Sequence, residues 1–475
     1  MIHSFKLSGF NIIVDAGSGS IHCVDDVAYD AIRVYEREGR KSAAAWISRE
    51  YAGLDEGEIV ELFGDIEELK GKAALFAEET YIPEKKEAPE TPVKALCMNV
   101  SHMCNMTCSY CFARGGGYDA HGALMSLDTG KRAIDFLVEN SGGRKRLDVD
   151  FFGGEPLLNW ETVKGIVRHA REREAGCGKV FRFTLTTNGS LVDEDVIDFT
   201  TREMHNVVLS LDGRRETNDA ARTFLDGGGS YDAVLPKIRR LVEARGGKGY
   251  YIRGTYTRSN LDFASDILHM ADLGFKELSM EPVVAKQGAP HALAKGDLPE
   301  IFGQYELLAE EMIRRKKEAR GFTFYHYKLD LTGGPCIYKR LAGCGVGTEY
   351  MAVTPDGHLY PCHQFIGEER FLLGDIWRGA TNEKLRKEFA GCGIRSRPEC
   401  RGCWARLYCS GGCAANAYSD TGSIAGVYGL GCELFKKRLE CAIMMKVVEG
   451  TGDRGQGTEE ERREDANRRS LRPES

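Results

Sequence analysis

The chain has 475 residues, enough for roughly two to four domains, and its 64 Lys and Arg against 71 Asp and Glu give a formal net charge of −7. This balance gives no electrostatic reason to expect nucleic acid or an anionic membrane as a partner. No run of apolar residues is long enough to cross a bilayer, and the first residues lack the basic start and long apolar core of a signal peptide. We therefore expect a cytoplasmic protein.

Residues 1–78 predict a small winged-helix-like domain. Short apolar runs separated by Ser8-Gly9 and by Gly17-Ser18-Gly19 indicate three strands within residues 4–24. Helical spacing follows: a helix that Asp25-Asp26 can cap, then helices over 42–51 and 55–70. A DNA-binding winged helix is the alternative, but the third helical segment is strongly acidic and would repel phosphate.

Residues 79–93 read as an extended linker, because they hold three prolines and many charges but little to bury. Over 94–325, strand-like runs alternate with amphipathic helical patterns. The expected strands are 95–100, 147–152, 180–186, 206–211, 250–256 and 277–281, and the expected helices are 127–139, 160–174, 193–202, 231–244, 262–272 and 299–317. This alternation predicts an α/β fold, a partial (β/α)6 barrel of the TIM type, with its active site at the carboxyl ends of the strands.

Three cysteines, Cys104, Cys108 and Cys111, follow the first expected barrel strand with C-x3-C-x2-C spacing. Three thiolates this close can hold three irons of a 4Fe-4S cluster and leave the fourth iron for an outside ligand. A zinc knuckle is the alternative, but a structural zinc site needs a fourth protein ligand and the sequence offers only His102 nearby.

Short polar motifs end the next three expected strands: Gly153-Gly154-Glu155-Pro156, then Thr187-Asn188-Gly189, then Ser210-Leu211-Asp212-Gly213. Each is, by itself, most often a tight turn. In this order, after consecutive parallel strands, they predict fixed donors and acceptors around one ligand, with glycines that allow close backbone approach.

Residues 326–448 are Gly- and Cys-punctuated, and nine of the 16 cysteines lie between Cys336 and Cys432. In a reducing cytoplasm this clustering favours metal ligation over disulfides. Clusters rather than a large apolar core would hold this domain together. Residues 449–475 are highly charged with almost nothing to bury, so we expect a disordered tail there.

At Cys104 to Cys111 and the strand-end motifs, the sequence resembles the radical S-adenosylmethionine (SAM) superfamily. The resemblance implies that the vacant iron chelates SAM, that Tyr110 lies against its adenine and that Gly153, Gly154 and Glu155 bind its amino group. It also implies that Ser210 contacts the ribose. Asn188 belongs to the same set of cofactor-binding loops, and Arg222 is a candidate partner of the SAM carboxylate.

Seven of the eight cysteines from Cys344 to Cys432, all except Cys392, resemble the pattern of the SPASM extension of peptide-modifying radical SAM enzymes. That resemblance implies two auxiliary 4Fe-4S clusters, three clusters in all. Cys400, Cys403, Cys409 and Cys432 would hold the outer cluster, and Cys344, Cys362 and Cys413 the inner one. Cys336 would complete the inner cluster, or its site would stay open for a substrate thiolate. Two zinc sites are the alternative.

Residues 1–75 resemble the RiPP recognition element, which implies a leader peptide added as a strand to the small sheet. From MIHSFKLSGFNIIVD through GGPCIYKRLAGCGVGTEYMAVTPDGHLYPCHQF, the chain resembles SCIFF-type (ranthipeptide) maturases. These form cysteine thioether links in a Cys-rich ribosomal peptide. The runner-up is an anaerobic sulfatase-maturase-like, formylglycine-forming enzyme. Those enzymes carry an Asp base directly after the cysteine corresponding to Cys362, whereas this chain has His363, which we expect to be structural.

The implied chemistry needs a low-potential electron donor of the flavodoxin or ferredoxin type as a second partner. Two other classes compete with it. A ferredoxin-like electron carrier would explain the clusters but not the strand-helix domain, and a winged-helix redox regulator would explain the front domain but not the barrel. Only the enzyme would release 5'-deoxyadenosine from SAM.

Overall fold

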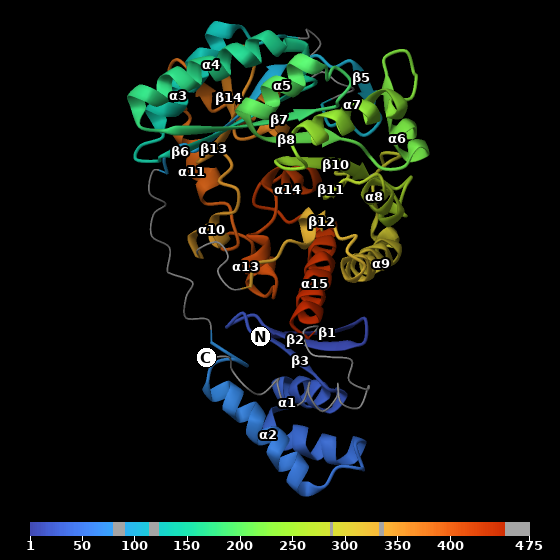
Figure 1. Ribbon diagram of the computed structural model, residues 1–475. Helices are drawn as coiled ribbons and strands as arrows, with labels where there is room; N and C mark the ends of the chain where they lie inside the picture. The colour runs from blue at the N-terminus through green and yellow to red at the C-terminus, as the bar shows by residue number, and fades with distance from the viewer. Residues whose placement is uncertain (79–90, 114–122, 286–287, 332–336, 452–475) are drawn as a thin grey trace.

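The computed structural model describes residues 1–78, 91–113, 123–285, 288–331 and 337–451 (Figure 1). Most of the expected linker, Cys336 and most of the expected tail lie outside these residues.

The amino-terminal region forms a three-stranded antiparallel sheet, β1 (Ile2–Leu7), β2 (Phe10–Asp15) and β3 (Ile21–Val24), followed by two helices. Helix α1 (Asp26–Glu50) is broken at Gly39, where φ is +78°, so it corresponds to two of the expected helices. Helix α2 (Glu56–Gly71) begins with a capping box between Asp55 and Glu58. The expected three strands and three helical segments are therefore confirmed.

The central sheet contains the expected parallel strands, arranged in chain order. These strands are β4 (Ala95–Ser101), β6 (Arg146–Gly153), β7 (Val180–Thr187), β8 (Met204–Ser210), β10 (Tyr250–Tyr256) and β11 (Glu277–Pro282). A short strand, β12 (Thr323–Phe324), pairs with β11 at one edge. Sequential parallel order is that of an open, partial (β/α)6 barrel, which confirms the expected fold class.

Helices cover the outer face of this sheet (Figure 1). They are α3 (Leu127–Asn140), α4 (Trp160–Cys177), α5 (Glu194–Glu203), α6 (Arg215–Ala221), α7 (Tyr231–Ala244), α8 (Phe263–Asp272) and α9 (Leu298–Lys317). Their apolar faces and the outward-facing strand residues form one continuous core. Helix α6 was not expected from the sequence, because its seven residues are too few to show a helical period.

The carboxyl-terminal region extends the sheet and adds short helices. Its strands are β13 (Tyr350–Val353), which pairs parallel with β4, then β14 (His358–Tyr360) and β15 (Gly374–Asp375). Its helices are α10 (Ile337–Ala342), α11 (Glu383–Ala390), α12 (Pro398–Arg401), α13 (Arg406–Cys409), α14 (Ala414–Thr421) and α15 (Gly429–Thr451).

The start of the expected tail is wrong by three residues, because α15 continues through Thr451. Glu449 accepts hydrogen bonds from Lys316 of α9 at 2.9 Å and from Lys446 at 2.8 Å. Composition alone did not reveal these pairings. In the described part of the chain, no helix combines the length and apolar character that crossing a bilayer requires.

The inner side of the barrel is polar, unlike the branched apolar layers that fill a complete TIM barrel. Along β10, Tyr250, Ile252 and Tyr256 pack into the outer core, so Tyr251 and Arg253 point inward. On β6 the inward Asp150 is largely buried, and burial followed by the nearby Asp148 raises its carboxyl pKa to about 6. The barrel interior is thus shaped to hold polar ligands.

This buried carboxyl predicts a pH-dependent stability. A raised pKa means that ionised Asp150 costs the folded state roughly 2–3 kcal/mol above pH 6, whereas the cost vanishes below the unfolded pKa near 4. We expect Asp150→Asn to raise the melting temperature at pH 8 and to change it little at pH 4. Asp198→Asn, which alters an exposed carboxyl on α5, is the matched control. Equal effects of Asp150→Asn at both pH values would contradict this account.

Candidate functional site

The Cys104, Cys108 and Cys111 loop is fixed by a small sheet at the carboxyl end of the barrel. Strand β5 (Met106–Cys108) pairs antiparallel with β9 (Arg222–Phe224), and Cys108 stands opposite Arg222. The Cys111 N–H donates to the Cys108 carbonyl at 3.0 Å. The loop is therefore clamped by a segment more than a hundred residues away in sequence.

The structure describes ten of the expected ligand thiols. They fall into three groups when they are sorted by which thiols raise one another's pKa. Burial raises the pKa of Cys104 to about 11, and Cys108 and Cys111 add to the rise. Burial likewise raises the pKa of Cys362 to about 12, with contributions from Cys413 and Cys344.

In the third group, burial raises the pKa of Cys409 to about 12, and Cys432, Cys400 and Cys403 contribute. Among these ten thiols the groups match the ligand sets that the family resemblance implies, although Cys392, which belongs to none of the sets, is also influenced by Cys344 and Cys413. Thiols with such high pKa values need a cation to become thiolates, so the sites suit an electropositive metal centre.

The donor chemistry fits iron-sulfur clusters. Among the described residues, no three His, Cys, Asp or Glu side chains are arranged to hold a single metal ion. A 4Fe-4S cluster binds each thiolate on a different iron, so its ligands stand farther apart than those of one ion. The ligand sets themselves stay predictions.

Tyr110, Asp212 and Arg222 form a buried hydrogen-bonded triad beside Cys108. The Tyr110 hydroxyl donates to Asp212 Oδ2 at 2.6 Å and accepts from Arg222 Nη1 at 2.8 Å. Asp212 Oδ1 also accepts from the Thr255 N–H at 3.0 Å. The triad thus ties the cluster loop to the ends of β8 and β10.

Glu155 is a buried acceptor that joins the loops after β6 and β7. Its Oε1 accepts from the Leu157 N–H at 3.0 Å and from the Thr187 hydroxyl at 2.8 Å, and its Oε2 accepts from the Asn188 N–H at 2.8 Å. The Glu155 carboxylate therefore holds the loop after β6 and the loop after β7 together. Asn188 in turn donates from Nδ2 to Asn105 Oδ1 at 2.9 Å, next to Cys104.

Gly153 shows why this loop requires glycine. Its φ is +140°, and a Cβ there would lie 2.1 Å from the Ser101 carbonyl oxygen. The next residue, Gly154, donates its N–H to that same carbonyl at 2.8 Å. Ser210, the remaining expected SAM contact, ends β8 in register with Arg253 of β10.

His363 links the inner thiol group to the first one. It is partly buried between the rings of Phe112, at 5.5 Å, and Phe152, at 4.8 Å between centroids. Burial, and secondarily Arg253, lowers its imidazole pKa to about 4. The residue after Cys362 therefore contacts the residue after Cys111.

Sequence reasoning missed the bridging roles of Asp212 and Asn105. Asp212 lies inside a motif that the sequence did single out, so its position was detectable although its partners were not. Asn105 gave no signal beyond its place between two cysteines. Cys336 lies outside the described residues.

Comparison with known proteins agrees with this architecture. Residues 98–257 match the Radical SAM superfamily, and residues 344–404 match SPASM, an iron-sulfur cluster-binding domain. The chain therefore contains a Radical SAM region and a SPASM domain, and these domains imply 4Fe-4S clusters and SAM binding.

Three relatives cover most of the chain. An uncharacterized protein of Archaeoglobus fulgidus is 27% identical, covering 73% of this chain and 80% of its own length. The radical SAM cyclopropyl synthase TigE of Paramaledivibacter caminithermalis is 22% identical, covering 72% of each chain. A serine-type anaerobic sulfatase-maturating enzyme of Klebsiella aerogenes is 24% identical, covering 75% of this chain and 88% of its own.

Two solved structures share the fold. Native anSMEcpe with bound AdoMet superposes with a TM-score of 0.62 at 20% identity, covering 76% of this chain and all of that one. Streptococcus suis SuiB bound to S-adenosylmethionine gives a TM-score of 0.52 at 16% identity, covering 90% of this chain and 97% of that one.

The Glu155 contacts predict a destabilising substitution. In Glu155→Gln an amide N–H2 replaces one carboxylate oxygen and faces a backbone N–H, which leaves buried donors unsatisfied. We expect a loss of about 1–3 kcal/mol of unfolding free energy, measured by denaturant unfolding under anaerobic conditions. Glu172→Gln, an exposed change on α4, should leave stability unchanged. Equal stability of the two variants would refute the bridging role.

Proposed function

We propose that this protein is a peptide maturase that forms cysteine thioether cross-links in a ribosomally made, Cys-rich precursor of the SCIFF type. The observation that supports the proposal is the contact between His363 and Phe112, because it brings Cys362 of the inner thiol group near the Cys104–Cys111 loop. A peptide in the polar barrel would then meet both sites at once.

The metal centres would supply the radical chemistry. Cys104, Cys108 and Cys111 would hold a cluster that, with SAM, would supply the chemistry to remove one hydrogen atom from the peptide. The proposed reaction breaks one C–H and one S–H bond and forms one C–S bond. The second hydrogen leaves as a proton, and one electron leaves with it.

The protein's own residues would orient the reactants. The Tyr110, Asp212 and Arg222 triad fixes the SAM-side loop, and its buried guanidinium favours an anionic group there. Glu155 holds the Asn188 loop against Asn105, so the two loops cannot separate. Such preorganisation limits motion of the reacting atoms.

His363 favours thioether formation over the alternative, formylglycine formation. The enzymes of the alternative carry an Asp base at this position, whereas this chain has an imidazole that packs against the rings of Phe112 and Phe152. The similarity to a serine-type anaerobic sulfatase-maturating enzyme keeps the alternative as an explicit outcome of the test.

Anaerobic reconstitution tests the enzyme class. We expect the protein to bind iron and sulfide for three clusters and to release 5'-deoxyadenosine from SAM with dithionite as reductant. A Cys104→Ala/Cys108→Ala/Cys111→Ala variant should lose one cluster's iron and all SAM cleavage. Zinc instead of iron in protein purified without oxygen would refute the proposal.

The product distinguishes the two reactions. The probe is a synthetic Cys-rich precursor peptide with its leader. A thioether consumes one free thiol and two hydrogens per link and leaves no aldehyde, whereas formylglycine reacts with hydrazides. Mass spectrometry with thiol alkylation and hydrazide labelling therefore separates them.

We also propose that residues 1–78 bind the leader of this precursor. Strand β1 lies against the rest of the molecule: His3 stacks on Trp404 with ring centroids 3.9 Å apart and bonds Glu440 at 2.9 Å. Among the described residues, no backbone hydrogen bond joins the outer edge of β3 to another segment. Strand addition at β3 is thus open.

Hydrogen exchange tests this assignment. We expect the full precursor to protect backbone amides of Ile21–Val24, because a new strand would satisfy them, whereas the core peptide without its leader should not. Protection confined to β1 or to α2 would place the leader elsewhere and overturn the assignment.

A further inference from the structure

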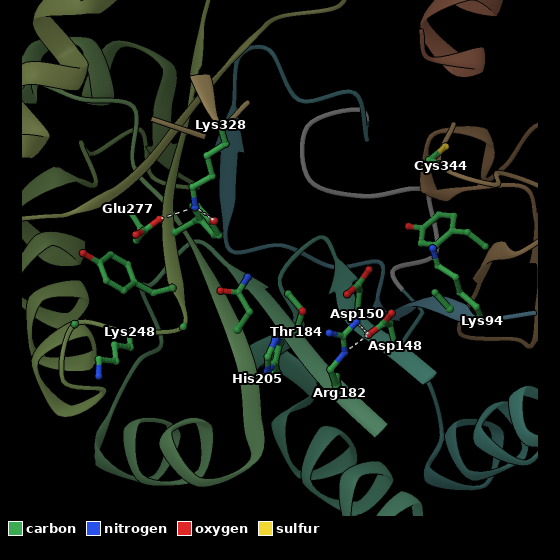
Figure 2. A pocket seen from close by; sticks show the side chains of 17 residues that line it. Lys94, Asp148, Asp150, Arg182, Thr184, His205, Lys248, Glu277, Lys328 and Cys344 are labelled. Carbon is green, nitrogen blue, oxygen red and sulfur yellow. Dashed lines mark hydrogen bonds and ion pairs between the residues drawn. The ribbon is translucent and has the colours of Figure 1, made fainter. Parts of the chain in front are cut away.

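The loops that follow β4, β6, β7 and β8, called here the SAM loops, lie at the carboxyl end of the barrel. A cavity of about 700 Å³ opens at the opposite end (Figure 2). It is bounded by residues at or near the amino ends of β4, β6, β7, β8, β10 and β11. Cys344, an exposed thiol of the inner group, also lines it. The proposed function uses the end of the barrel interior next to the Cys104–Cys111 loop and leaves this amino end without a role.

The cavity wall contains more cations than its carboxylates neutralise. Arg182 pairs with Asp148 at 2.7 Å, and Lys328 pairs with Glu277 at 3.1 Å (Figure 2). These pairs cancel. The lining also holds the carboxylate of Asp150 and the cations Lys94 and Lys248, of which Lys248 is exposed, so cations exceed carboxylates by one.

The rim beside the cavity adds further positive charge. Lys94 and Arg144 share one carboxylate, Glu349, at 3.9 and 3.0 Å. Lys145 and Arg146 follow at the start of β6 and are exposed. This end of the barrel is therefore positive, although the whole chain carries a formal net charge of −7.

Some cations at this edge have a structural purpose. Arg245 donates to the Met204 carbonyl at 3.0 Å, and Lys179 donates to the Gly142 carbonyl at 2.8 Å. In the described part of the chain, Lys145, Arg146 and Lys248 have no side-chain hydrogen bond or ion pair. Their charge is left for a partner to neutralise.

We propose that this cavity and its positively charged rim, together called the mouth, are the docking site of an acidic, low-potential one-electron carrier of the flavodoxin class. Complementary charge would steer the carrier onto the cavity and bring its redox centre beside Cys344. The reduced carrier loses one electron and the iron-sulfur centre at Cys344 gains it, while no bond forms or breaks. The inference rests on the proposed cluster loading of that thiol.

The position of the cavity also keeps the electron carrier away from the SAM loops. SAM loops follow the carboxyl ends of the strands, whereas the cavity lies at the amino ends of the same strands. A carrier docked at the mouth would therefore leave the SAM end free during a turnover.

The test measures binding of a purified flavodoxin to the anaerobically reconstituted full chain by calorimetry. We expect the variant Lys145→Glu/Arg146→Glu/Lys248→Glu to bind at least about tenfold more weakly, and wild-type binding to weaken similarly as salt rises. Flavodoxin-driven reduction, followed by cluster absorbance, should slow in parallel.

The matched control reverses the same number of exposed cations elsewhere, with Lys41→Glu/Lys295→Glu/Lys384→Glu. It should bind flavodoxin like the wild type. Both variants should keep wild-type iron content and dithionite-driven SAM cleavage, because none of these residues touches the SAM loops.

Three outcomes would overturn the docking site: no flavodoxin binding by the wild type, equal loss in both variants, or equally tight wild-type binding to heparin, which would mark a nonspecific anion surface. Failure of the proposed function is distinguishable from these. It would appear as missing iron or missing 5'-deoxyadenosine in the dithionite assay, whatever the flavodoxin result.

Discussion

The structure depends on the parallel alignment of six strands from β4 to β11. Parallel strands send all their carboxyl ends to one edge and all their amino ends to the other. The Cys104 loop, Glu155, Asn188 and Ser210 therefore meet, although they are spread over more than a hundred residues. The same alignment collects Lys248 with the cations at the start of β6 at the opposite end.

Two buried polar contacts turn this alignment into one site. The buried Glu155 carboxylate and the partly buried Tyr110 hydroxyl each have several hydrogen-bond partners. A buried polar group that loses a partner is costly, so these contacts hold the loops in one arrangement. His363 connects this site to the SPASM region, because its ring packs against Phe112 and Phe152.

Much of the fold was predictable, because its signals are local. Alternating apolar runs and helical periods located every barrel strand from β4 to β11 and six covering helices. Helix α6 and the strands β5 and β9 were not predicted, since each is too short to show a period and forms only by pairing with distant segments. The helical extension to Thr451 depends on Lys316, which no local pattern around Glu449 reveals.

The sequence by itself determined the candidate ligands and loops: the spacing of Cys104, Cys108 and Cys111, the seven later cysteines and the glycine-rich strand ends. Cysteine spacing reports ligand type because neighbouring thiols on one loop are near each other in any fold. Only the tertiary structure decided that Asp212 binds Tyr110, that Glu155 faces Thr187 and Asn188, and that positive charge gathers around Cys344. These contacts join residues far apart in the chain, so their physical cause is the packing of the sheet and not any local pattern.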